Sequence, residues 1–281
     1  MRSGVKPLCV PAFLVSAREG DRVDLQQNLE SMTRRYSRPQ IVAIWGHNQE
    51  NGLLAAERTM IEAWCPNRTL SFLCVGCGGG REVFALLRLG YEKVVGLEPS
   101  PALLLEARKY AAAHDLRPPL LRAEASHLPY DAESFDVVTM FENVYGHITP
   151  HDARLRSLAE ARRVLRPGGL VLMYVTSLHN HWYYRWSIAG LDVLRRLYNP
   201  QRMERGDKRM RGEKHLTTRG SGFVARSHWF RPDDVPHDAA MTALEVALTS
   251  TVAGVVDDPR GNSDRLVGRG RLVYVLRRPI P

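Results

Sequence analysis

An apolar run that ends abruptly in a cluster of glycines constrains the fold of this chain most. The run Leu70–Val75 is followed by glycines at positions 76, 78, 79 and 80. This pattern is typical of a buried strand that turns sharply into a helix. Glycines at such a turn remove the Cβ atoms that would hold a ligand away from the backbone, and they leave N–H groups at the helix start available to donate. We therefore predict that a ligand lies against this loop.

An acidic residue follows the next apolar run. The run Lys93–Leu97 ends directly before Glu98, which places a carboxylate at the carboxyl end of the second predicted strand. A carboxylate in that position can accept hydrogen bonds from the two vicinal hydroxyls of a ribose. The predicted ligand is therefore nucleotide-like.

Strand and helix patterns alternate along the rest of the chain. Predicted strands cover Leu70–Val75, Lys93–Leu97, Leu120–Ala123, Phe135–Phe141 and Leu170–Thr176, and predicted helices cover Asp21–Arg35, Asn51–Trp64, Arg81–Leu89, Pro101–His114 and the segment from Pro150 to Leu165. Ser100 and Thr149 each precede a proline and are predicted to begin helices. Such alternation predicts parallel strands covered by helices on both faces. Two later runs, Ala243–Val252 and Leu272–Arg277, predict an antiparallel hairpin that closes the sheet.

The length of the chain favours one globular domain with additional segments. A chain of 281 residues can bury one substantial core. The segment before residue 18 contains two prolines and no convincing cleavage site, so we interpret it as an extension and not as a signal peptide. No apolar run reaches the length of a membrane span.

Four unevenly spaced cysteines do not form a disulfide framework, and we expect a cytoplasmic protein. Cys74 and Cys77 have no second pair that would complete a zinc site.

A strongly basic segment lies in the second half of the chain. Residues 185–226 contain eleven Lys and Arg residues against four acids, which gives this segment +7 of the net charge of +9. The segment could be a solvated face, a groove for an anionic acceptor or a nucleic-acid surface. Its aromatic residues cluster at one end, and no recognisable RNA-binding module accompanies them. We therefore favour a lid over a small or carrier-bound acceptor.

Five motifs in order make this chain resemble class I S-adenosylmethionine-dependent methyltransferases. They are Gly76–Gly80, Glu98, Glu124–Tyr130, Ser134–Val138 and Leu165–Gly169, and the resemblance covers about residues 70–177. It implies an α/β fold: a Rossmann-like, seven-stranded, mostly parallel sheet with helices on both faces and a C-terminal antiparallel hairpin that inserts one antiparallel strand. A nicotinamide-dependent dehydrogenase fits less well, because Arg81 stands where its third spaced glycine is required.

The resemblance also implies a cofactor, S-adenosyl-L-methionine, and the residues that bind it. In the family, the glycine loop passes beneath the methionine portion, the acid after the second strand holds the ribose hydroxyls, and a later acid lies near the adenine amino group. The implied cofactor-binding residues are Gly76, Cys77, Gly78, Gly80, Glu98, Pro99, Glu124, Ala125 and Glu142. Family members commonly carry Asp where this chain has Glu124.

Catalytic candidates follow the fourth and fifth strands, because ligands in open α/β sheets lie beyond the carboxyl ends of the strands. Alignment of the reactants can supply about 7 to 11 kcal/mol of the barrier reduction, so a dedicated catalytic residue is not required. If the acceptor is a hydroxyl, a base such as His would help. The catalytic candidates are His147, Glu142 and Tyr145, and the substrate-binding candidates are His179, His181, Tyr183 and Trp186. His147 could instead pack its loop, and the aromatic residues, with Tyr36 and Trp45, could instead dock their segments onto the sheet.

These observations divide the chain into four parts. We expect an N-terminal extension or cap at 1–50, an S-adenosylmethionine-binding core at 51–177, a basic aromatic insertion that forms a substrate lid at 178–226, and the C-terminal part of the core sheet at 227–281. The predicted function is methyl transfer to a small-molecule acceptor, with anionic and carrier-bound molecules among the candidates. No metal or membrane is expected, and a nucleic-acid partner is disfavoured. The alternatives are an RNA or protein methyltransferase that uses the basic segment, and a non-catalytic cofactor-binding protein.

Overall fold

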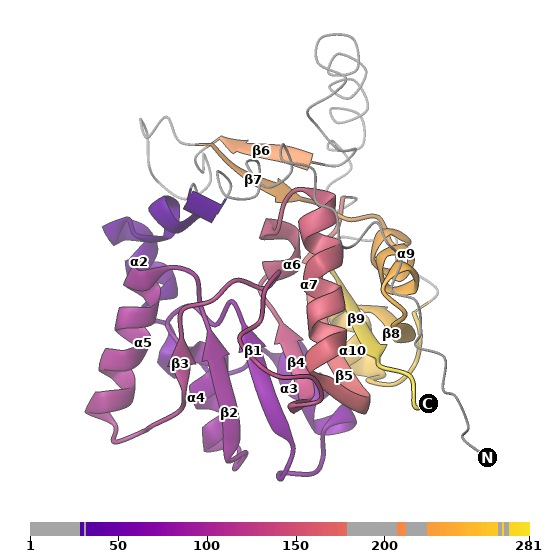
Figure 1. The fold of residues 1–281 in the computed structure, drawn as a ribbon, viewed down its shortest axis with the longest axis horizontal. Coiled ribbons are helices and arrows are strands. Elements are labelled where there is room, and N and C mark those ends of the chain that lie inside the picture. Colours follow the sequence, from indigo (N-terminus) through magenta and orange to yellow (C-terminus); the bar gives the residue numbers. More distant parts are fainter. Residues whose placement is uncertain (1–28, 31, 179–206, 212–223, 264–265, 267–269) are drawn as a thin grey trace, which may run out of the picture.

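The structure, a computed structural model, describes residues 29–30, 32–178, 207–211, 224–263, 266 and 270–281. A seven-stranded sheet forms its centre, with the strand order β3-β2-β1-β4-β5-β9-β8 (Figure 1). Its strands are β1 Ser71–Val75, β2 Lys93–Leu97, β3 Leu120–Leu121, β4 Phe135–Met140, β5 Leu165–Thr176, β8 Glu245–Thr251 and β9 Arg271–Arg277. A separate ribbon pairs β6 Asp207–Arg211 with β7 Val224–His228.

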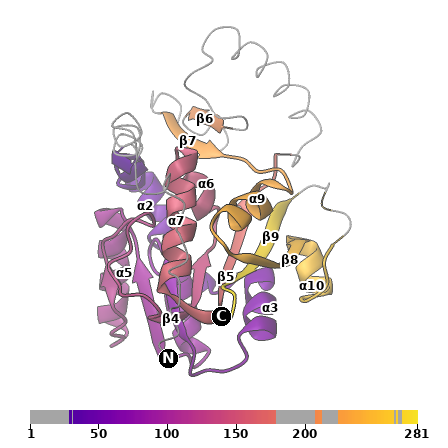
Figure 2. The same cartoon turned by 45° about the vertical axis from the view of Figure 1, so that its right-hand side comes forward.

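The strand directions confirm the predicted fold class. Strands β1 to β5 pair in parallel, and β9 is antiparallel to both of its neighbours, β5 and β8. Figure 2 shows β9 between these two strands. The last hairpin therefore inserts one antiparallel strand into an otherwise parallel sheet, as the resemblance implied.

Helices cover both faces of the sheet. They are α2 Pro39–Trp45, the 3-10 helix η2 Gln49–Asn51, α3 Ala55–Trp64, α4 Arg81–Arg88, α5 Pro101–Ala113, α6 Val144–His147, α7 His151–Val164, α9 Asp234–Met241 and α10 Val252–Asp257. Alternate residues of the buried strand β1 enter two separate cores. Phe72 packs into a core with α3, α4, α5 and α10, whereas Leu73 packs into a core with α7 and α9. None of the described helices combines the length and the apolar character needed to cross a bilayer.

Several predicted boundaries differ from the observed ones. The N-cap prediction holds at Ser100, whose hydroxyl accepts a hydrogen bond from the N–H of Leu103. It is wrong at Thr149, because α7 begins one residue later, with Pro150 at its cap and no side-chain cap. Strand β5 starts at Leu165 instead of Leu170, because Leu165 already pairs with β4 before a shift in register. Helices α2, α6, α9 and α10 were not predicted.

The segment 32–52 packs directly on the glycine loop. The N–H of Gly79 donates to the carbonyl of Trp45 at 2.9 Å. Side chains of α4 hold the same segment, since Arg88 Nη2 donates to the carbonyl of Gln49 at 2.8 Å and Arg81 Nη1 to that of Gly52 at 2.7 Å. We call residues 32–52 the N-terminal cover.

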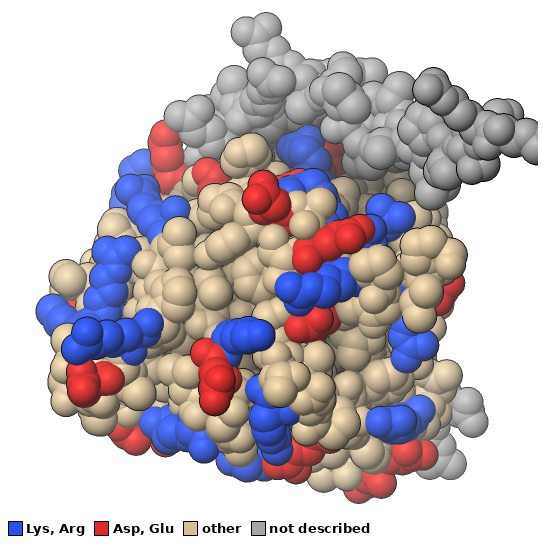
Figure 3. Space-filling view, turned by 60° about the horizontal axis from the view of Figure 1, so that its bottom comes forward, with Lys and Arg blue, Asp and Glu red and all other residues tan. Residues whose placement is uncertain are grey.

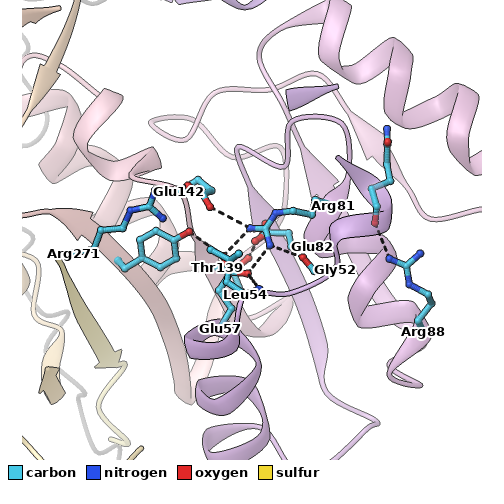
Figure 4. A network of polar contacts seen from close by, with 11 residues as sticks. Gly52, Leu54, Glu57, Arg81, Glu82, Arg88, Thr139, Glu142 and Arg271 are labelled. Atoms are coloured by element: carbon cyan, nitrogen blue, oxygen red, sulfur yellow. Dashed lines mark hydrogen bonds and ion pairs between the residues drawn. The ribbon is translucent and has the colours of Figure 1, made fainter. Parts of the chain in front are cut away.

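A buried ion pair joins α3 to the start of α4 (Figure 4). The carboxylate of Glu57 is fully buried and accepts two hydrogen bonds from the Arg81 guanidinium, at 2.6 and 2.7 Å. It also accepts from the N–H of Leu54 at 2.8 Å and from the hydroxyl of Tyr174 at 3.0 Å. Burial alone would lower the pKa of Arg81, but the hydrogen bonds and charge of Glu57 outweigh it and raise that pKa. The pair is therefore charged and well satisfied.

Replacing Glu57 by Gln should lower the free energy of unfolding by about 3 to 5 kcal/mol, because it leaves the Arg81 cation buried without its counter-charge. Urea denaturation followed by circular dichroism measures this. Glu62→Gln on the same helix is the matched control: its pair with Arg58 is exposed, so the expected loss is below about 1 kcal/mol. Equal losses in the two variants would contradict the role assigned to the buried pair.

Replacing Gly79 by Ala should displace the N-terminal cover. A Cβ at Gly79 would lie 2.5 Å from the carbonyl oxygen of Gly46, so amide hydrogen exchange of residues 32–52 should become faster. Gly90→Ala is the control, because Gly90 has a φ of 87° and no atom near its added Cβ. That variant stores about 1 to 2 kcal/mol of backbone strain but should leave exchange in the cover unchanged. Unchanged exchange in both variants would disprove that the N-terminal cover packs on the glycine loop at Gly79.

Candidate functional site

A cavity lies where the carboxyl ends of β1, β2 and β4 meet. It encloses about 1050 Å³, counting the part open to solvent. The core contributes Val75, Gly76, Gly78, Glu98, Pro99, Ser100, Leu103, Ala123, Glu124, Ala125, Ser126, Glu142, Val144, His147 and Ile148, and the N-terminal segment contributes Leu29, Met32, Thr33, Tyr36 and Trp45. This is the position at which open α/β sheets bind their ligands.

The glycine loop forms the floor of the cavity, and its shape requires glycine. Gly76 has a φ of 70°, and a Cβ there would lie 2.5 Å from the side chain of Val144. Gly78 has a φ of 56°, and its N–H donates to Glu98 Oε2 at 2.9 Å. The backbone of this loop therefore lies bare against the cavity, as the sequence predicts.

Glu98 is held rigidly at the end of β2. Its side chain is 5% exposed, and its two oxygens accept hydrogen bonds from the N–H groups of Ser100 and Gly78 at 2.8 and 2.9 Å. Burial raises the pKa of Glu98 to about 7, although the two backbone hydrogen bonds lower it. Each oxygen has a second lone pair that can accept from a ligand. The carboxylate is therefore oriented for a pair of neighbouring hydroxyls.

Glu142 lies between two arginines at the end of β4 (Figure 4). Its backbone is left-handed, with a φ of 51°. One carboxylate oxygen lies 3.0 Å from Nη2 of Arg271, which belongs to β9, and the other lies 3.8 Å from Nη2 of Arg81. Two cations from distant parts of the chain therefore fix this carboxylate at the wall of the cavity.

The third acidic residue of the cavity follows β3. Glu124 and His127 form an isolated bridge, in which the N–H of His127 donates to the carbonyl of Glu124 at 3.2 Å. This tight turn places Glu124, Ala125 and Ser126 along the cavity. The predicted positions Glu124 and Ala125 are thus brought together with Glu98, while their contacts to adenine remain a prediction.

His147 meets Tyr36 at the side of the cavity. The hydroxyl of Tyr36 lies 3.5 Å from Nε2 of His147, and the two rings are edge to face with centroids 6.2 Å apart. Desolvation by the surrounding protein and, to a smaller extent, the charge of Arg35 lower the pKa of His147 to about 4. The imidazole is therefore neutral at physiological pH.

Three sequence-predicted site residues do not line this cavity. The hydroxyl of Tyr145 is completely buried and donates to Asp238 Oδ2 at 2.7 Å, which gives it a packing role in place of the predicted catalytic one. Cys77 is buried with its Sγ beside Gly96, and burial raises the pKa of its thiol well above the usual value. Gly80 serves the turn, because a Cβ there would lie 2.4 Å from the ring of Phe84.

Some predicted site residues lie outside the described residues, and some residues that line the cavity were not predicted. The substrate-binding candidates His179, His181, Tyr183 and Trp186 lie outside the described residues. Conversely, Met32, Thr33, Val144 and Ile148 line the cavity but were not predicted to do so. The weak helical pattern before residue 36 was the one signal available for the first two.

The residues present fit S-adenosylmethionine. Glu98 offers acceptors to a ribose diol, and the Gly76–Gly78 backbone offers a surface that a Cβ would fill. Glu142 places a negative charge beside the loop, where a ligand with an ammonium and a sulfonium group would be attracted. This donor set has the polarity that the cofactor requires.

Comparison with known proteins agrees with this fit. Residues 72–169 match the family model of a methyltransferase domain. An uncharacterized methyltransferase of Bacillus subtilis, YodH, is 34% identical over 122 residues, which cover 43% of this chain and 49% of the relative. A ubiquinone biosynthesis O-methyltransferase of Cereibacter sphaeroides is 34% identical over 136 residues, covering 48% of this chain and 53% of the relative. The chain thus spans about half the length of these curated relatives.

A solved structure shows the same fold. The S-adenosylmethionine-dependent methyltransferase of Methanosarcina mazei superposes with a TM-score of 0.60 at 18% identity, covering 79% of this chain and 98% of the other. The region matched by the family model, residues 72–169, contains the glycine loop and strands β2, β3 and β4. Residues 72–169 therefore match a methyltransferase domain, and the fold around them is that of a solved S-adenosylmethionine-dependent methyltransferase, which makes S-adenosylmethionine the cofactor that this fold implies.

Proposed function

We propose that this protein transfers a methyl group from S-adenosylmethionine to a small-molecule acceptor. The observation that carries the proposal is the arrangement of Glu98, which accepts from two backbone N–H groups and faces the cavity beside the glycine loop. A decayed cofactor site would not need to keep a carboxylate buried at this position, since an unused buried charge costs stability.

The chain's own residues bind and align the reactants. When bound, the cofactor supplies an electrophilic methyl group on a positively charged sulfur. Glu98 orients the ribose, and the glycine loop supports the methionine portion. Glu142 offsets the positive charge of the cofactor. The N-terminal cover packs over the loop and limits access of water. Alignment of this kind can supply about 7 to 11 kcal/mol of the barrier reduction.

The form of the cavity supports a small acceptor. The cavity is lined on one side by the N-terminal segment and on the other by α6 and the loop after β3, so an acceptor has to enter between packed elements. Figure 3 shows only the face at the bottom of Figure 1, where Lys and Arg side chains are interspersed with Asp and Glu. The RNA or protein alternative depends on residues 185–226, most of which lie outside the described residues, and it stays a prediction.

Isothermal titration should show that the protein binds S-adenosylhomocysteine, the product of the proposed reaction. Glu98→Ala should weaken this binding by about 1.5 to 3 kcal/mol for each charge-assisted hydrogen bond that is lost. Glu62→Ala on α3, whose carboxylate forms an exposed pair with Arg58, is the control and should bind as the wild type does. No binding by the wild-type protein would refute the proposed function.

The affinity for S-adenosylhomocysteine should rise with pH between about 6 and 8. Glu98 has a pKa of about 7 in the unliganded protein, and ribose hydroxyls donate to its ionised form, so binding releases a proton and is weaker below that pKa. Below the pKa the affinity should change by up to about tenfold per pH unit. Glu98→Gln should remove this slope while retaining weaker binding. An identical slope in this variant would show that another group titrates.

A further inference from the structure

Two groups can be distinguished among the residues that line the cavity. The first comprises the three carboxylates of Glu98, Glu124 and Glu142 together with the glycine loop, and the cofactor accounts for it. The second comes from the N-terminal helical segment and α6 and carries no formal charge at neutral pH. Its members are Leu29, Met32, Thr33, Tyr36, His147 and Ile148. The proposed function so far leaves this second group without a ligand.

The second group has an apolar wall and one polar pair. Leu29, Met32 and Ile148 supply aliphatic surface, whereas Tyr36 and His147 place a hydroxyl and an imidazole nitrogen 3.5 Å apart. Both of these groups can donate and accept hydrogen bonds. Pockets that select small apolar molecules have this composition, in which a few polar atoms orient the ligand.

The charges around the cavity disfavour an anionic acceptor. Among the described residues that line it, all the formal charges are carboxylates, and no Lys or Arg is present. An anionic acceptor in the same cavity would meet their negative potential, and the described lining offers no Lys or Arg to pair with it. The described cations close to the cavity have other contacts: Arg81 and Arg271 pair with Glu142. Arg35 is 6% exposed and lies over the ring of Tyr36 at 5.9 Å, outside the lining. An alkyl amine would arrive protonated and without a lone pair for the reaction.

We propose that the group around Tyr36 and His147 is the acceptor site, and that it takes an uncharged, largely apolar molecule that presents a hydroxyl to this pair. This inference rests on the proposed function and specifies its substrate class. The hydroxyl oxygen forms its bond to the methyl carbon with a lone pair, while the electron pair of the broken carbon–sulfur bond stays on sulfur. The hydroxyl proton passes to the neutral imidazole of His147 and then to water. The neutral state of His147, whose pKa is about 4, suits it to receive this proton from a strongly acidic methylated oxygen.

A matched pair of probes tests the substrate class. The wild-type protein is first saturated with S-adenosylhomocysteine, and its binding is measured by titration. The complex is then titrated with 4-propylphenol and with 3-(4-hydroxyphenyl)propanoate, which have similar size and the same hydroxyl but differ in charge. The neutral phenol should bind at least about tenfold more tightly than the carboxylate. With the methyl donor in place of the product, the phenol should be methylated on its oxygen.

Two variants test whether the phenol binds against the apolar wall of the cavity. Met32→Glu and Leu29→Glu each put a carboxylate on the apolar wall and should weaken phenol binding at least about tenfold, with S-adenosylhomocysteine affinity largely retained. Leu29 is only partly buried, so this variant provides the test if Met32→Glu fails to fold. Leu105→Glu is the control, because Leu105 is 51% exposed on α5 and does not line the cavity.

Each outcome separates this inference from the proposed function. Failure to bind S-adenosylhomocysteine would refute the proposed function itself. If that product binds but the carboxylate probe binds as tightly as the phenol, the substrate class is wrong. The inference is also overturned if neither probe binds the saturated protein, or if both wall variants bind the phenol as the wild type does.

Discussion

The close approach of backbone to backbone at the glycine loop is the constraint on which the rest of this structure depends. The loop is packed from three sides: Glu98 accepts from the N–H of Gly78, the carbonyl of Trp45 accepts from that of Gly79, and Val144 lies against Gly76. Side chains on these glycines would separate β2, the N-terminal cover and α6 from one another. The cavity exists because these elements meet at a loop that has no side chains.

Charge compensation is distributed over the same region. Arg81, at the start of the helix that follows the loop, binds Glu57 in the core and approaches Glu142 at the cavity wall. Arg271 contacts Glu142 from the other side. Breaking the buried pair of Arg81 and Glu57 is costly even where its net contribution to stability is small. The arrangement therefore fixes the position of a cavity carboxylate more than it adds to the overall stability.

Sequence patterns over a few neighbouring residues were sufficient to predict the strands and strand ends that such residues determine. Glu98 could be placed because a carboxylate directly after an apolar strand has to lie at the strand end, and β2 was predicted with its observed bounds. The four-residue helix α6 offered no such pattern, since it is too short to show a periodicity. Tyr145 does not line the cavity and donates instead to Asp238, 93 residues away in sequence, a contact that no local pattern indicates. The N-cap prediction at Thr149 was wrong because α7 begins at His151, which makes Pro150 the cap residue instead of Thr149.

The insertion of β9 between β5 and β8 has a consequence for the order of folding. Parallel strands β1 to β5 can pair as the chain emerges during synthesis, but until β9 is made, the edge of β5 is unpaired and β8 has no neighbour in the sheet. Exposed strand edges promote aggregation. Because Arg271 lies on β9, the wall of the cavity at Glu142 is also completed by this last strand. A nascent chain of this protein would thus hold a nearly complete sheet with an unfinished site, and its protection from aggregation and its competence to bind would be gained in the same step.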